Sequence, residues 1–201
     1  MAKTLEKLKA GYSAFREQYA DGNNSFMHLL SKKGQSPKVM VVACSDSRVD
    51  PALVLQCAPG DLFIVRNVAN IIPPYEKDNR CHGTSAALEF AICHLKVDHL
   101  IIMGHSQCGG IEALTNQEGL GSDFIENWVA SVSEAAKAGP IDACAQAALH
   151  QSYQHALGFP WIKERIDASK LQIHRWFFDI KTGSICCYEE GSKSFLPLTK
   201  E

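Results

Sequence analysis

The sequence predicts an α/β fold in which a mainly parallel β-sheet is flanked by helices. Short apolar runs rich in β-branched residues have the composition of buried strands, and stretches with helical periodicity separate them. Strands that alternate with helices are typical of parallel sheets, because a parallel connection needs a crossover. We expect an N-terminal helical arm before this sheet and a strand addition after it.

Three runs predict the parallel strands. Residues 38–43 read KVMVVA, residues 61–65 read DLFIV, and residues 99–103 read HLIIM and end at Gly104. The first and third runs are short, apolar and β-branched, which predicts buried strands, and the second run is a further strand candidate.

A hairpin-like turn predicts the C-terminal addition. Lys181-Thr182-Gly183 separates residues 171–179 from residues 184–189, and both flanking runs have strand composition. This addition is expected to be antiparallel.

Helices are predicted between and around these strands. Residues 4–19 place apolar side chains at steps of three and four with charges between them, which predicts an amphipathic helix. Further helical segments are predicted at residues 25–30, 84–95, 110–114, 123–157 and 160–167. We expect one domain over residues 1–201, with residues 1–24 as its helical arm.

Composition excludes several classes of protein. The chain has 201 residues, 46% hydrophobic residues and a net charge of -2, so no excess of positive charge predicts binding to nucleic acid or to a membrane surface. No apolar run approaches the ~18 residues of a membrane-spanning helix. The charged N-terminus has no apolar signal region, and the eight cysteines are then expected to be reduced in a cytoplasmic protein.

Two polar segments follow predicted buried strands. The first is Cys44-Ser45-Asp46-Ser47-Arg48, and the second spans residues 104–110 with the sequence GHSQCGG. Ligand sites in open α/β sheets form beyond the carboxyl ends of strands. The two segments therefore meet in one crevice if their strands are neighbours.

The second segment and Cys44 together predict a zinc site. Cys44, His105 and Cys108 offer two thiolates and one imidazole, and three protein ligands with an open fourth position are typical of catalytic zinc. Asp46 is either a fourth ligand that closes the site or a carboxylate that Arg48 holds off the metal. Taken singly, each segment also fits a core cysteine or a capped turn, so the pairing of the two carries the prediction.

The same segments resemble a known family. ACSDSRVDP, PGDLFIVRNVAN and GHSQCGGI are similar to the signature segments of β-class carbonic anhydrases, and the similarity runs over residues 25–115 and more loosely to about residue 167. The resemblance implies reversible hydration of carbon dioxide to bicarbonate and a proton. It also implies one Zn²⁺ per subunit on Cys44, His105 and Cys108.

The resemblance further implies roles for residues around the metal. Asp46 and Arg48 would form the catalytic dyad, and zinc-bound hydroxide would be the nucleophile. A homodimer or higher oligomer is implied, because two subunits of the family share each active site. Val41 and Ala43 replace the tryptophan and glycine of the bicarbonate-gated branch, which indicates the plant-type branch with an open site at neutral pH.

The substrate pocket is also implied by resemblance. Gln35 matches the family's catalytic glutamine, which approaches the metal across the dimer interface. The residues that match the pocket are Phe63, Phe90, Gly109 and Gly110. Phe90 stands where the plant-type pocket has a tyrosine, so the hydroxyl of that tyrosine is missing here.

Two other functions remain open at this point. The same fold and zinc site could hydrolyse carbonyl sulfide or carbon disulfide, and Gln35 with the Asp46–Arg48 dyad favours carbon dioxide instead. A non-catalytic zinc protein would need neither Asp46 nor Arg48 beside an open position.

Overall fold

The computed structural model describes residues 2–78, 80–116 and 123–199. The chain divides into two compact units, Met1–Ser36 and Pro37–Glu201. In the first unit, helix α1 spans Ala2–Phe15 and continues as a π-helical turn over Arg16–Ala20, which confirms the predicted amphipathic helix. Helix α2 spans Phe26–Lys33.

Three apolar side chains of α1 are more than half exposed to solvent. The exposed fractions are 59% for Leu5, 64% for Leu8 and 63% for Tyr12. Isolated exposed apolar residues are ordinary, but a row of them along one helix marks a surface that another surface can cover.

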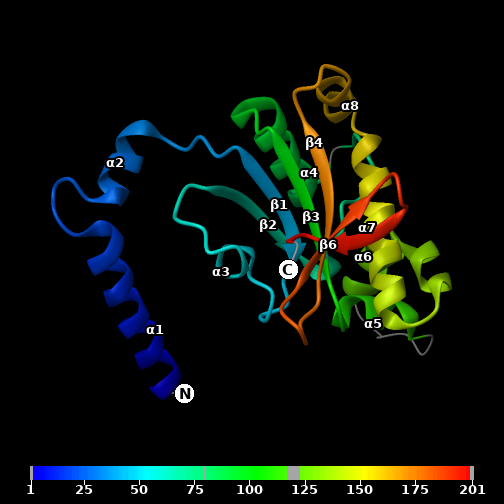
Figure 1. Ribbon diagram of the computed structural model, residues 1–201, viewed down its shortest axis with the longest axis horizontal. Helices are drawn as coiled ribbons and strands as arrows, with labels where there is room; N and C mark the ends of the chain where they lie inside the picture. The colour runs from blue at the N-terminus through cyan, green and yellow to red at the C-terminus, as the bar shows by residue number, and fades with distance from the viewer. Residues whose placement is uncertain (1, 79, 117–122, 200–201) are drawn as a thin grey trace. The chain divides into compact units, whose positions relative to one another are not determined.

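One sheet organises the second unit (Figure 1). Within the described residues it has six strands in the order β2-β1-β3-β4-β5-β6. The strands are β1 (Val39–Cys44), β2 (Leu62–Asn67), β3 (His99–His105), β4 (Gln172–Phe178), β5 (Ile185–Glu189) and β6 (Ser194–Pro197). The first four strands in this order are parallel and the last two are antiparallel, which confirms the predicted fold class.

The helices agree with the predicted segments, with one addition. They are α3 (Pro51–Val54), α4 (Gly83–Glu89), α5 (Gly109–Thr115), α6 (Ile125–Ala130), α7 (Ile141–Leu157) and α8 (Pro160–Asp167). The predicted helical segment 123–157 is interrupted before α7 at Gly139, whose φ is +110°. Helix α3 was not predicted, because four residues are too few to show a period.

The core explains why β1 and β3 are apolar without alternation. Met40 and Val42 of β1 belong to the main hydrophobic core with residues of the helices, whereas Val41 and Ala43 pack with residues of β3 in a smaller cluster. All four side chains are 0% exposed. A strand that is buried on both faces has no polar face to show in its sequence. Helix α7 packs against β3 and β4.

No helix in the described part of the chain combines the length and the apolarity needed to cross a membrane.

Strand order places the two polar segments together. β1 pairs with β3 in parallel, so Cys44 at the end of β1 and His105 at the end of β3 leave the sheet at the same edge. The neighbouring strands that the sequence analysis required are therefore present.

Gly110 lets α5 begin against the end of β2. A Cβ atom at this position would lie 2.6 Å from Val68 Cγ1 and 3.0 Å from Ala69 Cβ. Val68 and Ala69 belong to a 3₁₀ turn in which Ala69 has a φ of +63°, so the turn has little freedom to move away.

We expect Gly110→Ala to lower the free energy of unfolding by about 1–3 kcal/mol, because the added methyl overpacks this contact. Thermal and urea denaturation measure the effect. Gly109→Ala is the matched control, since its Cβ would meet no atom within 4 Å. Equal stability of the two variants would show that the turn yields freely.

Candidate metal centre

Three buried side chains converge at the carboxyl ends of β1 and β3. The possible ligand atoms of Cys44, His105 and Cys108 lie within 4.8 Å of one another, and the two sulfur atoms are 3.9 Å apart. In the described residues this is the cluster that could hold a metal ion. The structure therefore brings together the three residues predicted as ligands.

The orientation of His105 leaves one ring nitrogen free. Its Nδ1 lies 2.8 Å from the carbonyl oxygen of Ser106, and since a carbonyl can only accept, Nδ1 carries the proton. Its Nε2 is buried and has no hydrogen-bond partner among the described residues. Buried polar atoms without a partner are rare, and a lone pair on Nε2 is what a metal ion requires.

The two thiols differ in acidity because they touch. The hydrogen bond from Cys108 lowers the pKa of the Cys44 thiol to about 4, whereas the same contact raises the pKa of Cys108. Burial disfavours charge on His105, but the neighbouring Cys44 sulfur outweighs it and raises the pKa of the imidazole. Two adjacent thiolates need a cation between them, so the donor set fits a divalent metal.

Asp46 is paired with Arg48 on both carboxylate oxygens. Arg48 Nε donates to Oδ1 at 3.0 Å and Nη2 donates to Oδ2 at 2.7 Å, while the Arg48 backbone N–H also donates to Oδ1 at 2.9 Å. These bonds hold the pKa of Asp46 well below its usual range. Of the two arrangements that the sequence left open, the structure has the carboxylate bound to the guanidinium.

Arg66 supports the loop that carries these residues, and it was not among the site residues predicted from the sequence. From β2 it donates to the carbonyl oxygens of Cys44 at 2.9 Å and Asp46 at 2.6 Å, and to Asp50 Oδ2 at 2.8 Å. The sequence feature that could have indicated a role for Arg66 is its charge inside an otherwise apolar strand. Two of its three acceptors are backbone atoms, and a pairing of side chains in the sequence could have revealed only the contact with Asp50.

Asn67 fixes the turn on the other side of the same loop. Its side-chain amide donates to the Ile71 carbonyl at 2.8 Å and to Thr84 Oγ1 at 3.2 Å, and its carbonyl accepts the Ile71 N–H at 2.8 Å. Its backbone carbonyl accepts the Ser45 N–H at 2.9 Å. One asparagine thus links the loop after Cys44 to the turn that packs on Gly110.

The predicted pocket residues lie in two parts of the chain. Phe63 and Phe90 are in contact, with ring centroids 5.9 Å apart, and Phe90 is 43% exposed. Gly109 and Gly110 begin α5 directly after Cys108. Gln35 belongs to the first compact unit, so its predicted role at the metal stays a prediction.

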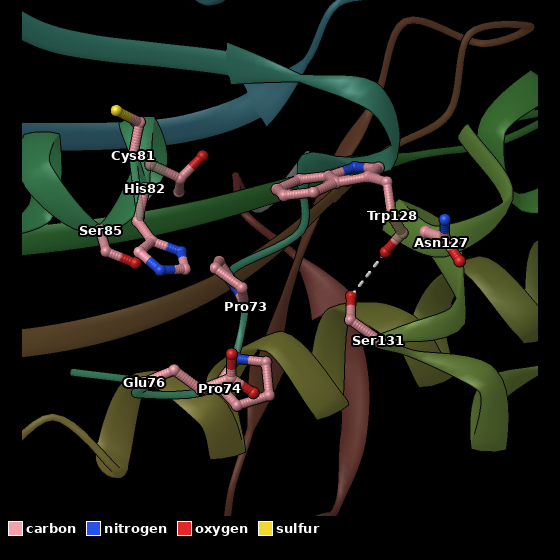
Figure 2. Close-up of a pocket in the computed structure, with 11 residues that line it drawn as sticks. Pro73, Pro74, Glu76, Cys81, His82, Ser85, Asn127, Trp128 and Ser131 are labelled. Atoms are coloured by element: carbon pink, nitrogen blue, oxygen red, sulfur yellow. Dashed lines mark hydrogen bonds between the residues drawn. The ribbon is translucent and has the colours of Figure 1, made fainter. Parts of the chain in front are cut away.

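A separate hollow of about 450 Å³ lies beside α4 and α6 (Figure 2). Its lining includes Pro73, His82 and Trp128, and none of the three predicted metal ligands. Trp128 Nε1 donates to the Val68 carbonyl at 2.8 Å, so the wall of this hollow supports the turn against which α5 packs.

The fold and the centre together define a class: an α/β protein with a buried site of two cysteines and one histidine at the carboxyl edge of a parallel sheet. The family model described as carbonic anhydrase matches residues 39–185. The chain belongs to the carbonic anhydrase family, whose members are enzymes, and its relatives place it in the β class.

Two curated relatives are plant proteins. Beta carbonic anhydrase 5, chloroplastic, of Arabidopsis thaliana is 37% identical over 205 residues, which cover 95% of this chain and 66% of the relative. Beta carbonic anhydrase 3 of the same plant is 34% identical, and the match covers 94% of this chain and 79% of the relative. Both agree with the predicted plant-type branch.

Solved structures show the same fold. The β-carbonic anhydrase CcaA superposes with a TM-score of 0.88 at 28% identity, over 99% of this chain and 94% of that chain. One of two tetrameric β-carbonic anhydrases from Sordaria macrospora superposes with a TM-score of 0.74 at 30% identity, over 92% of this chain and 94% of that chain.

Proposed function

We propose that this protein catalyses the reversible hydration of carbon dioxide to bicarbonate and a proton at one Zn²⁺ per subunit. The observation that carries the proposal is the buried convergence of Cys44, His105 and Cys108, with Nε2 of the imidazole free to bind. Zinc in this site would lower the pKa of a coordinated water and so supply hydroxide as the nucleophile for carbon dioxide.

Asp46 and Arg48 would orient that nucleophile. Oδ1 accepts two hydrogen bonds from Arg48 and Oδ2 accepts one, so Oδ2 retains a further lone pair. A carboxylate held ionised by Arg48 can accept a hydrogen bond at any pH near neutrality, which fixes the direction of the nucleophile's remaining lone pairs.

The pocket would exclude water from the apolar substrate. Phe63 and Phe90 form an apolar wall, and Gly109 and Gly110 keep the start of α5 free of side chains. Gln35 would donate a hydrogen bond to a substrate oxygen. Since Phe90 has no hydroxyl, the pocket would bind bicarbonate without the bond that a tyrosine could make.

We also propose that two copies of the chain share each site, with Gln35 reaching the metal of its partner. The exposed apolar row on α1 and the half-exposed Phe90 support a second copy as the partner, and the Sordaria macrospora relatives are described as tetrameric. The cytoplasmic location stays a prediction, because one plant relative is described as chloroplastic.

Stopped-flow measurement of carbon dioxide hydration tests the activity. We expect turnover that a chelator abolishes and that added Zn²⁺ restores, because removing the metal removes the nucleophile. Carbonyl sulfide and carbon disulfide, assayed side by side, should be poorer substrates. Zinc bound without hydration of carbon dioxide would refute the proposed function.

Asp46→Asn should retain zinc and lose about 100-fold in kcat/KM, because the amide can no longer act as an ionised acceptor. Since Arg48 lowers the pKa of Asp46, the loss should be similar at every pH between about 6 and 9. Activity of the parent should rise with pH, as the nucleophile forms on loss of a proton, and this rise should persist in the variant.

Asp98→Asn is the control for this experiment. Asp98 forms an exposed ion pair with Lys38 at the opposite end of the strands, so its charge can be removed without touching the site. A loss in Asp46→Asn that disappeared toward one end of the pH range would assign the acceptor role to another group.

Subunit complementation tests the shared site. Gln35→Ala and Cys44→Ser should each be poorly active alone, and mixed dimers should regain activity, up to about a quarter of the parent after random exchange. In a mixed dimer, one subunit has an intact Cys44 and the other has an intact Gln35. These two residues can act at the same metal only if Gln35 reaches the site of the other subunit. Absence of recovery in dimers shown to be mixed would place Gln35 at its own metal.

A further inference from the structure

A carboxylate outside the predicted ligand and dyad residues contacts the metal-binding loop. Asp142, in the first turn of α7, accepts the backbone N–H of Gln107 on Oδ1 at 2.7 Å. Gln107 lies between the two ligands His105 and Cys108. The contact therefore acts on the backbone from which both ligands project.

Gln107 needs such support because its backbone is strained. Its φ is +54°, in the left-handed region that residues other than glycine rarely adopt. A hydrogen bond from its N–H to a charged acceptor is stronger than one to a neutral group and offsets this strain. On the other side of the loop, Ser106 donates its N–H to the Phe178 carbonyl and accepts the Ile180 N–H on Oγ.

The same residue connects Asp142 to the dyad. The carbonyl oxygen of Gln107 accepts a hydrogen bond from Arg48 Nη2 at 3.3 Å, and Nη2 also binds Asp46. Rotation of the Gln107 backbone would carry this carbonyl away from the guanidinium. Asp142 is thus linked to Asp46 through the N–H and the carbonyl of Gln107 and then through Arg48.

We propose that Asp142 is a positioning residue for carbon dioxide hydration. By holding Gln107 in its left-handed conformation, it sets the direction of the carbonyl that steadies Arg48 and fixes the place of Cys108. This role rests on the proposed function, and Asp142 itself touches neither the predicted ligands nor the dyad.

Asp142 has a second effect that the test must separate. A carboxylate in the first turn of a helix stabilises the helix through the macrodipole, whatever its hydrogen bonds. Asp142→Asn loses this charge effect but keeps an oxygen acceptor, whereas Asp142→Ala loses both. A hollow on this side of the loop is lined by Gln107, Glu112 and Asp142, so Glu112→Ala controls for loss of negative charge nearby.

The experiment measures kcat, KM, zinc content and the visible spectrum of the cobalt-substituted protein for the three variants. We expect Asp142→Ala to lower kcat about tenfold with KM changed less than about twofold, since one charge-assisted bond is lost. Its cobalt absorption bands should shift, because they report coordination geometry. Asp142→Asn should recover most of kcat and the parent spectrum, and Glu112→Ala should match the parent.

Three results would overturn the proposal. They are an unchanged kcat and spectrum in Asp142→Ala, equal losses in Asp142→Ala and Glu112→Ala, and no recovery in Asp142→Asn when circular dichroism shows that all variants are folded. A parent protein that binds cobalt but does not hydrate carbon dioxide would refute the proposed function alone. The cobalt spectra of the variants would then still report whether Asp142 positions the loop.

Discussion

The contact between two sulfur atoms at the ends of neighbouring parallel strands governs the rest of this site. Cys44 and Cys108 lie 3.9 Å apart and are buried, so without a cation only one of them can readily give up its proton. His105 adds a free imidazole nitrogen to the same space. A divalent metal resolves both problems at once, since it neutralises two thiolates and occupies the unpartnered nitrogen.

The scaffold positions these ligands through their backbone rather than through their side chains. Arg66 bonds to the carbonyl of Cys44, Asn67 accepts the N–H of Ser45, and Asp142 accepts the N–H of Gln107. This division follows from the chemistry, because a ligand atom bound to metal has few lone pairs or protons left for other partners. Fixing the peptide groups leaves the sulfur and nitrogen atoms available.

The sequence predicted the strands and the convergence of Cys44, His105 and Cys108 because both leave local patterns. Apolar runs directly before Cys44 and Gly104 indicate buried parallel strands, and parallel neighbours must bring their carboxyl ends together. Arg66 and Asp142 left no comparable pattern. Arg66 donates to the backbone carbonyls of Cys44 and Asp46, and Asp142 accepts the backbone N–H of Gln107, so both contacts depend on strand register and on one left-handed residue. Gln35 was predicted only by resemblance, because the role proposed for it depends on a second subunit and leaves no local pattern in one chain.

The bonds of Asp46 explain why it lies on the guanidinium and not among the ligands. The carboxylate accepts three hydrogen bonds from Arg48, two of them from the charged side chain. To reach a metal it would have to give up bonds that hold its pKa low, and Arg48 would lose its ion-pair partner beside the carbonyl of Gln107. A lysine could not replace Arg48 here, because one ammonium lacks the planar fork that serves both carboxylate oxygens and a carbonyl together. The open coordination position in our proposal therefore depends on an arginine that never touches the metal.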